Sequence, residues 1–309
     1  MTPTPILLDC DPGHDDAIAL LLALASPEVE LLGVTTVSGN QTLEKTTANA
    51  LRILEFVGRN VPVAAGADRP LVRERYVAAY VHGESGLDGP DLPPPQRSPL
   101  DAHAVEFLAE QIDASAAPVT LVPTGPLTNV GLLLARYPDT AARLERIVLM
   151  GGAIAEGNVT PAAEFNIWAD PEAAHRVFTA GIDVTMIGLD VTHRALLTPE
   201  HAERLRTSGR VGGLVADLFD FYHRFHVETY GFHGSPVHDA VAVAHVIRDD
   251  LVQTLDRGVV VDCGGELSRG RTYVDLWRRA QWPVNAHVGV DIDGDGFIAF
   301  LLERLISLG

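Results

Sequence analysis

The sequence is poor in cysteine, in basic residues and in long apolar runs, and each shortage excludes a class of protein. Its 309 residues include only two cysteines, Cys10 and Cys263, which can neither build a disulfide framework nor form a C-x-x-C zinc or redox pair. Lys and Arg number 23 against 41 Asp and Glu, so the formal net charge is −18. Such an acidic surface repels phosphate backbones and anionic lipids, which argues against partners such as nucleic acid or a membrane surface.

The longest apolar helix candidate, Ala17 to Ala25, is far shorter than the roughly 20 residues that span a bilayer. Asp9 and Asp11 interrupt the first apolar run, and no basic segment precedes it, so we expect neither a secretory leader nor a transmembrane segment. Together with the scarcity of cysteine, this predicts a cytoplasmic protein. Hydrophobic residues are abundant, at 47% of the chain, which is enough to bury a large core.

Runs typical of β-strands alternate with helical runs, which predicts an α/β fold with an open, mainly parallel sheet flanked by helices. Strands are expected at 6–9, 29–37, 62–65, 119–122, 147–150, 184–189, 259–261 and 286–291. Helices are expected at 15–25, 43–56, 103–112, 127–135, 171–180, 199–206, 214–228, 238–247 and 297–306. No linker divides the chain, so residues 1–309 are expected to form one domain, with the proline-rich stretch 92–99 in an ordered loop over the sheet edge.

The strongest chemical signal lies at the end of the first expected strand, in Asp9-Cys-Asp11-Pro-Gly-His-Asp15-Asp16. Four carboxylates in eight residues repel one another, and burying them without a cation would raise their pKa values. A divalent metal is the simplest way to stabilise them, and an oxygen-only site suits calcium or magnesium. The structural alternative is that Asp15 and Asp16 cap the following helix, although one cap needs only one side chain.

Other polar residues follow later strands of the predicted sheet. They are Asn40, Thr124, Asn158, Glu164 and Asn166. Ligands of open parallel sheets bind outside the carboxyl ends of the strands, so we expect these side chains to join the aspartates there. Each one alone is also compatible with an ordinary turn. Together they offer amide and carboxylate groups that can hold vicinal hydroxyls.

Several motifs, spread in order over nearly the whole chain, resemble those of the nucleoside hydrolases, both inosine-uridine preferring and pyrimidine-specific. They are Asp9-Cys-Asp11-Pro-Gly-His-Asp15-Asp16, Gly39-Asn40-Gln41, His82-Gly-Glu-Ser-Gly-Leu-Asp-Gly89, Pro123-Thr-Gly-Pro-Leu-Thr-Asn129, Glu164-Phe-Asn166 with Asp170-Pro-Glu172, and Val237-His238-Asp239-Ala240. The first motif is the most diagnostic of the family. The resemblance implies an enzyme that uses bound Ca²⁺ to split a ribonucleoside into ribose and a free base.

The resemblance also implies roles for individual residues. The metal ligands would be the side chains of Asp11, Asp16 and Asp239 and the backbone carbonyl of Thr124, and Asp11 would also be the general base. The ribose would be held by Asp15, Asn40, Asn158, Glu164, Asn166 and Asp239. His238 would face the leaving base, and His82 with its loop and the segment 222–230 match flaps near the base. Family members are homo-oligomers, more often tetramers than dimers.

Several points stay open at the level of sequence. His238 opens an expected helix, so its side chain could protonate the leaving base, or it could only cap the helix or bond to a carbonyl. Whether His238 or His82 is the main proton donor also stays open. Cys10 and His14 in the first motif resemble the pyrimidine-preferring branch, which favours uridine and cytidine, while purine nucleosides such as inosine remain an alternative. A non-enzymatic calcium or sugar-binding module is a rival reading. A phosphatase of the Asp-x-Asp type is disfavoured by Gly13, where that motif has Thr or Val.

The segment Asp291-Ile-Asp293-Gly-Asp295-Gly296 matches the first half of an EF-hand loop. Its twelfth position is Leu302, where calcium binding requires a bidentate Glu. We therefore expect a strand-to-helix turn at this point rather than a second calcium site.

Overall fold

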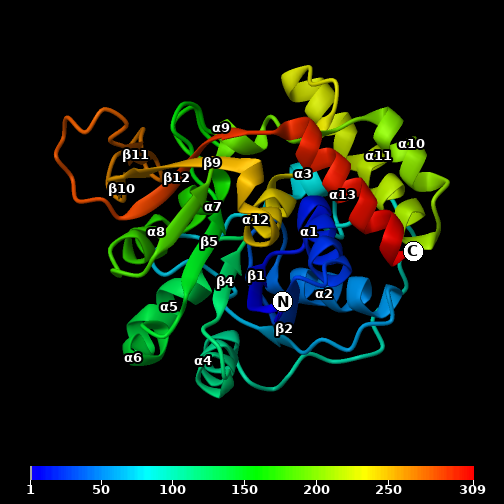
Figure 1. Ribbon diagram of the computed structural model, residues 1–309, viewed down its shortest axis with the longest axis horizontal. Coiled ribbons are helices and arrows are strands. Elements are labelled where there is room, and N and C mark those ends of the chain that lie inside the picture. The colour runs from blue at the N-terminus through cyan, green and yellow to red at the C-terminus, as the bar shows by residue number, and fades with distance from the viewer. Residues whose placement is uncertain (1) are drawn as a thin grey trace.

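A computed structural model describes residues 2–309, and its centre is an eight-stranded sheet in the order β3-β2-β1-β4-β5-β6-β12-β9 (Figure 1). The strands are β1 (Thr4–Cys10), β2 (Val29–Thr36), β3 (Val63–Ala65), β4 (Thr120–Pro123), β5 (Arg146–Met150), β6 (Val184–Ile187), β9 (Val252–Arg257) and β12 (Ala286–Ile292). Every pairing in this sheet is parallel except that of β12 with β9. The structure thus confirms the predicted open, mainly parallel α/β sheet.

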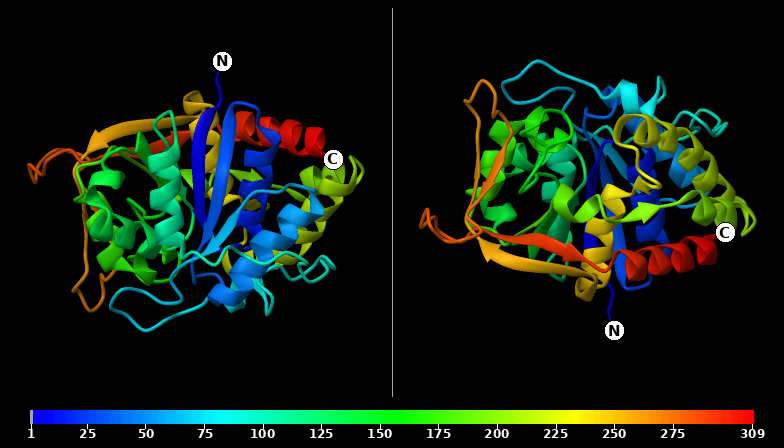
Figure 2. Two further views of the ribbon diagram at one scale, coloured as in Figure 1. Left: turned by 90° about the horizontal axis from the view of Figure 1, so that it is seen from below. Right: turned by 90° about the horizontal axis from the view of Figure 1, so that it is seen from above.

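Helices cover both faces of the sheet, which lies between them in Figure 2. The longer ones are α1 (His14–Ala25), α2 (Leu43–Phe56), α4 (Ala104–Ala114), α5 (Thr128–Arg136), α8 (Pro171–Phe178), α10 (Pro199–Arg206), α11 (Arg210–Tyr230), α12 (His238–Ile247) and α13 (Gly294–Leu308). Side chains alternate across β1, so that Ile6 and Leu8 pack with α1, α2, α11, α12 and α13, whereas Leu7 packs with α4, α5 and α8. Both faces of the sheet are therefore buried, as in other parallel sheets.

Short elements complete the described chain. They are α3 (Ala79–His82), α6 (Pro138–Ala141), α7 (Phe165–Ala169), α9 (Leu189–Thr192), a 3₁₀ turn (Asp249–Leu251), and the two-stranded pairs β7 (Leu196–Leu197) with β8 (Ser235–Pro236) and β10 (Val259–Val261) with β11 (Thr272–Val274). The expected strand 184–189 ends earlier, at Ile187, because the chain turns into α9 after Gly188. Among residues 2–309, none of the helices has both the length and the apolar character that a bilayer crossing needs.

The EF-hand-like segment is a strand-to-helix turn, as expected. Strand β12 ends at Ile292 and α13 begins at Gly294. The Asp293 carboxylate accepts a hydrogen bond of 3.0 Å from the backbone N–H of Gly296, which is the usual cap of a helix N-terminus. Asp291 forms an ion pair with Arg194.

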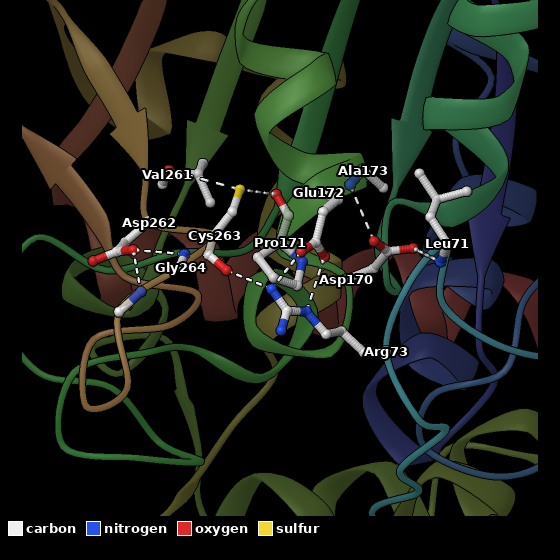
Figure 3. A network of polar contacts seen from close by, with 11 residues as sticks. Leu71, Arg73, Asp170, Pro171, Glu172, Ala173, Val261, Asp262, Cys263 and Gly264 are labelled. Carbon is white, nitrogen blue, oxygen red and sulfur yellow. Dashed lines mark hydrogen bonds and ion pairs between the residues drawn. The ribbon is translucent and has the colours of Figure 1, made fainter.

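A polar network joins the loop after β3 to α8 and to the turn after β10 (Figure 3). The Arg73 guanidinium pairs with Glu172 at 2.5 Å and also donates to the carbonyl of Cys263. The Asp170 carboxylate accepts from the backbone N–H groups of Leu71 at 2.9 Å and Ala173 at 3.0 Å. The Asp170-Pro-Glu172 motif therefore fixes the segment that leads towards α3.

Candidate active site

One pocket at the carboxyl ends of the strands gathers most of the polar residues singled out from the sequence. Those that line it are Asp15, Asn40, His82, Thr124, Asn158, Glu164, Asn166, His238 and Asp239. Asp11 and Asp16 lie directly behind them and are buried. The backbone N–H of Asn40 donates to Asp11 at 2.6 Å, and its side-chain amide donates to Asp16 at 2.9 Å. The structure thus brings the whole predicted set to one place.

The turn between β1 and α1 positions the two carboxylates of Asp11 and Asp16. Asp16 accepts hydrogen bonds from the backbone N–H groups of Gly13 at 3.1 Å and Asp11 at 3.3 Å, so its side chain does serve the helix N-terminus. It also accepts from the hydroxyl of Thr124 at 2.9 Å. Asp15 has no such capping bond, and its Oδ1 is buried without a partner among the described residues. Helix capping therefore accounts for two of the hydrogen bonds of the Asp16 carboxylate, and it does not account for the presence of Asp15.

Asp9, the first carboxylate of the motif, lies outside the pocket. Its Oδ1 accepts hydrogen bonds from the Thr35 hydroxyl at 2.6 Å and from the Asn129 amide at 2.8 Å. Burial raises the pKa of Asp9 to about 6, and these two bonds oppose that rise. Asp9 therefore links β1 to β2 and α5 by hydrogen bonds. The carboxylate that lies closest to Asp15 and Asp16 in the cluster is that of Asp239.

Asp239, near the start of α12, completes the cluster with Asp15 and Asp16. The three side chains offer oxygen atoms that all lie within 4.8 Å of one another. Burial, followed by the neighbouring Asp16, raises the pKa of Asp15 to about 8. Burial and then the nearby Asp15 raise the pKa of Asp239 well above its usual range. A bound cation would stabilise such a group of buried carboxylates, because it favours their ionised forms.

The donor set fits a hard divalent cation. Asp11 Oδ1 and Asp15 Oδ1 are buried without hydrogen-bond partners in residues 2–309, and no sulfur or imidazole ligand belongs to the cluster. The Thr124 carbonyl accepts from the Asn166 amide at 2.7 Å, which leaves its second lone pair free. The unpartnered oxygen of Asp11 belongs to the ligand set expected from the sequence. The other expected ligands are Asp16, Asp239 and the Thr124 carbonyl, and Asp15 lies beside Asp16 and Asp239.

Two glycines allow the backbone to approach Asp11 closely. A Cβ atom on Gly39 would lie 2.1 Å from Asp11 Oδ2, and one on Gly125 would lie 2.5 Å from Asp11 Oδ1. No real side chain tolerates such distances, so any substitution here displaces the Asp11 carboxylate.

We expect Gly39→Ala to lower kcat by about 10²-fold, because a displacement of reacting groups by about 1 Å costs that much. The matched control is Gly213→Ala in α11, where a Cβ meets nothing within 4 Å. The control should retain activity and gain about 0.5–1 kcal/mol of stability, since alanine favours helices. Steady-state kinetics and thermal melts of both variants check this. Full activity of Gly39→Ala would contradict the steric argument.

Glu164 and Asn158 hold the segment that enters the pocket from β5. The Glu164 carboxylate caps α7 by accepting from the backbone N–H groups of Asn166 at 2.8 Å and Ile167 at 3.2 Å, and it also accepts from Gly152 at 2.9 Å. Burial outweighs these bonds and raises the pKa of Glu164 to about 7. The Asn158 side-chain oxygen accepts from Phe165 at 2.9 Å, so its amide N–H groups remain for a ligand.

His238 does not cap α12, whose N-terminus has no side-chain cap. Its Nδ1 lies 2.7 Å from the hydroxyl of Thr192, at the end of α9. Burial and then the positive form of nearby His193 lower the pKa of His238 well below its usual range. Its ring centre lies 5.5 Å from that of His193. The His238 side chain therefore does not cap α12, and it lines the pocket.

Sequence reasoning missed part of the pocket wall. Three aromatic residues of the wall were not expected at all: Tyr80, Phe165 and His193. The segment 222–230 was expected near the base, but not which of its rings line the pocket, and these are Tyr222, Phe225, His226 and Tyr230. His193 follows β6 at the carboxyl edge of the sheet, so the strand-end rule could have found it. Tyr80 gave no such signal, because its position depends on packing of α3 against α11, where it meets Phe225 at 5.8 Å.

The chain is similar to known proteins over nearly its whole length. The family model described as inosine-uridine preferring nucleoside hydrolase matches residues 6–299. The chain is 51% identical to the pyrimidine-specific ribonucleoside hydrolase RihA of Escherichia coli O8 (strain IAI1) over 304 residues, which cover 97% of this chain and 98% of the relative.

Solved structures give the same result. The purine-preferring ribonucleoside hydrolase from Gardnerella vaginalis superimposes with a TM-score of 0.93 at 35% identity, covering 99% of each chain. An inosine-uridine preferring nucleoside hydrolase from Bacillus anthracis has a TM-score of 0.80 at 25% identity, covering 98% of this chain and 99% of that one. The chain therefore belongs to the inosine-uridine preferring nucleoside hydrolase family and is an enzyme that hydrolyses the N-ribosyl bond of ribonucleosides.

Proposed function

We propose that this pocket hydrolyses pyrimidine ribonucleosides, uridine and cytidine, with the help of a bound Ca²⁺. The observation that carries the proposal is the pair of unpartnered, buried oxygens on Asp11 and Asp15 beside a pocket lined by carboxylate and amide groups. The pyrimidine preference is supported by the 51% identity to a relative named as pyrimidine-specific. The wording of the first motif, with Cys10 and His14, points the same way.

Asp11, Asp16, Asp239 and the Thr124 carbonyl would hold the calcium ion. When bound, such an ion orients a water molecule and lowers its pKa. Asp11 then acts as the general base that removes the proton of the attacking water. The close backbone at Gly39 and the 2.6 Å bond from Asn40 hold its carboxylate in a single orientation, which this role requires.

Cleavage of an N-riboside builds positive charge on the sugar ring, so the site needs negatively charged groups near the ring and hydrogen bonds that hold the ribose hydroxyls in place. The residues proposed to supply these are Asp15, Asn40, Asn158, Glu164, Asn166 and Asp239. Asn166 is itself fixed by bonds from its amide to the carbonyls of Thr124 at 2.7 Å and Met150 at 3.1 Å. A sugar held by such fixed groups can be bound more tightly in its transition state than in its ground state.

His238 is proposed as the group that protonates the leaving base. We expect His238→Ala to lower kcat on uridine by about 10²–10⁴-fold, the usual contribution of a general acid. The loss should be far smaller on a riboside with an activated leaving group such as nitrophenol, because that group departs without a proton. Parallel kinetics on the two substrates check this. Equal losses on both would remove the acid role.

The proposed function is tested by incubating the Ca²⁺-loaded enzyme with uridine, cytidine, inosine and a phosphate ester while ribose and phosphate are measured. Ribose release fastest from uridine and cytidine supports the proposal. Faster release from inosine would make the enzyme purine-preferring. Phosphate release would indicate a phosphatase, and the absence of both products would indicate a binding module.

Three further expectations from the sequence belong to this proposal. Residues 1–309 would act as one domain, the protein would be a homo-oligomer, with a tetramer favoured over a dimer, and it would work in the cytoplasm. Sedimentation or light scattering of the purified protein tests the oligomeric state.

A further inference from the structure

A groove lined by arginines lies away from the active site, in a chain whose net charge is −18. It is bounded by the end of α2, the turn that follows α2, the proline-rich stretch 92–99 and the start of α11. Its volume is about 540 Å³, which is the size of pockets that hold small molecules. We call it the arginine groove, after Arg52, Arg59, Arg97 and Arg210.

Helix α2 separates the arginine groove from the active site. Asn40, which lines the active-site pocket, comes just before α2, whereas Arg52 and Phe56 belong to its C-terminal half. A helix of 14 residues is about 21 Å long. The residues that line the groove and those that line the active-site pocket are different sets. A ligand in the groove would therefore not touch the reacting atoms.

The charge of the arginine groove is not neutralised by the protein. The ion pairs within residues 2–309 involve other arginines. Among the lining residues the one carboxylate is that of Glu55, which accepts hydrogen bonds from the backbone N–H groups of Gln96 at 3.0 Å and Arg97 at 2.7 Å. Four guanidinium groups and one carboxylate leave a formal charge of +3.

Two of the arginines also contact the protein. The Arg97 guanidinium donates to the carbonyls of Arg59 at 2.9 Å and Val61 at 2.7 Å, so it holds the turn after α2. Arg52 donates one bond of 3.3 Å to the side-chain oxygen of Asn49, and its Nε is buried without a partner in the described part of the chain. A buried N–H without an acceptor is costly, and an anion bound by Arg52 can supply that acceptor.

The other two arginines, Arg59 and Arg210, are exposed. Within residues 2–309 neither guanidinium donates a hydrogen bond, and Arg59 takes part only through its backbone carbonyl. The Arg210 guanidinium lies 4.1 Å from the ring centre of Phe56, a contact that restricts the side chain without using its N–H groups. A side chain that is already restricted loses less freedom when a ligand binds.

We propose that the arginine groove binds a small molecule with a chain of two or more phosphate groups, such as pyrophosphate or a nucleoside diphosphate. The planar guanidinium group matches phosphate oxygens with paired N–H donors. A terminal phosphate carries about two negative charges and three acceptor oxygens, so one chain can serve several arginines. A carboxylate offers only two oxygens. The net charge of the protein opposes this only weakly, because charges more than about 8 Å away are largely screened at physiological ionic strength.

Isothermal titration calorimetry of the Ca²⁺-loaded enzyme at physiological ionic strength tests the site with pyrophosphate, ADP and citrate. We expect pyrophosphate and ADP to bind. Equal affinities support recognition of the phosphate chain alone, and tighter binding of ADP supports a nucleotide as the ligand. Citrate carries a similar charge without phosphate, so binding as tight as that of pyrophosphate would overturn the phosphate assignment. If neither pyrophosphate nor ADP binds, the site itself is refuted.

The double variant Arg59→Gln/Arg210→Gln should raise the Kd for pyrophosphate by at least about 10-fold, because two charged donors are lost. Arg59→Gln alone, at an exposed turn, should raise it by at least about 3-fold and serves if the double variant does not fold. The matched control is Arg176→Gln/Arg279→Gln, which removes two exposed arginines outside the groove and should bind as the wild type does.

The choice of residues keeps the active site out of the test. Arg52 stays unchanged because its partner Asn49 also donates to the carbonyl of Pro12 at 3.1 Å, in the turn between β1 and α1. Pyrophosphate also binds Ca²⁺, but that binding would be the same in the wild type and the double variant. Retained affinity in Arg59→Gln/Arg210→Gln therefore overturns the proposal.

Light scattering and uridine kinetics complete the test. A changed oligomeric state of the double variant would mean that the arginines hold an acidic surface of a second copy of the chain, and it would overturn the proposal. Without added phosphate the double variant should hydrolyse uridine as the wild type does, because the groove lies at the far end of α2. The binding measurement needs no turnover, so it stands even if the proposed function fails.

Discussion

Asp11→Asn should lower kcat/KM on uridine by about 10⁴-fold while the protein stays folded, because one substitution removes both the general base and a metal ligand. The asparagine oxygen can still accept the 2.6 Å bond from the backbone of Asn40, so the local structure should persist. Steady-state kinetics, together with a thermal melt, check the result. Activity within about 10-fold of the wild type would show that Asp11 is neither the general base nor a metal ligand.

The chain offers a matched control two residues away. Asp9 is also fully buried at the end of β1, but it faces Thr35 and Asn129 rather than the pocket. In Asp9→Asn the side-chain oxygen can still accept both bonds, so kcat/KM should change by no more than a few-fold. A loss as large as that of Asp11→Asn would mean that general disturbance of the acidic cluster, and not the chemistry of Asp11, explains both results.

Removal of divalent metal should also abolish turnover. We expect dialysis against EDTA to lower kcat by at least about 10³-fold, because the water would lose both its orientation and its lowered pKa. Addition of Ca²⁺ should restore the activity. Retention of turnover in protein shown to be free of metal by elemental analysis would contradict the proposed mechanism.

The same metal should make stability depend on pH with a defined sign. Without metal, the pKa of Asp15 is raised from 3.8 to about 8, so the folded state binds its proton more tightly than the unfolded state does. The contribution of Asp15 to stability is therefore complete below pH 4 and is lost as the pH rises towards 8. Asp15 lies beside the proposed calcium ligands Asp16 and Asp239, and a bound Ca²⁺ would favour its ionised form, so Ca²⁺ should raise Tm more at pH 8.5 than at pH 6. Calorimetry at both pH values checks this, and a larger shift at pH 6 would contradict it.

Long elements with clear boundaries could be predicted from the sequence. The expected ranges 43–56, 199–206 and 238–247 coincide with α2, α10 and α12. For α10 the reason is local, because Pro199 starts the helix and the Thr198 hydroxyl caps it at 3.4 Å from the backbone N–H of His201.

Short and edge elements were missed. Strand β9 pairs antiparallel at the sheet edge, and its side chains are mostly half-buried or exposed, so it lacks the apolar run of an inner strand. Helices α3, α7 and α9 are only four or five residues long, and they exist because of tertiary packing and caps such as Glu164.

The sequence by itself determined the acidic cluster after the first strand and, through its resemblance to the nucleoside hydrolases, the class of reaction, because the motifs that carry both are short and contiguous in the chain. The tertiary structure decided how these carboxylates are placed relative to one another. Asp9 is turned by the strand towards Thr35 and Asn129, whereas Asp239 arrives from a helix more than 200 residues later. It also decided the aromatic wall of the pocket, because its rings come from segments far apart in the chain and no local pattern records that they meet.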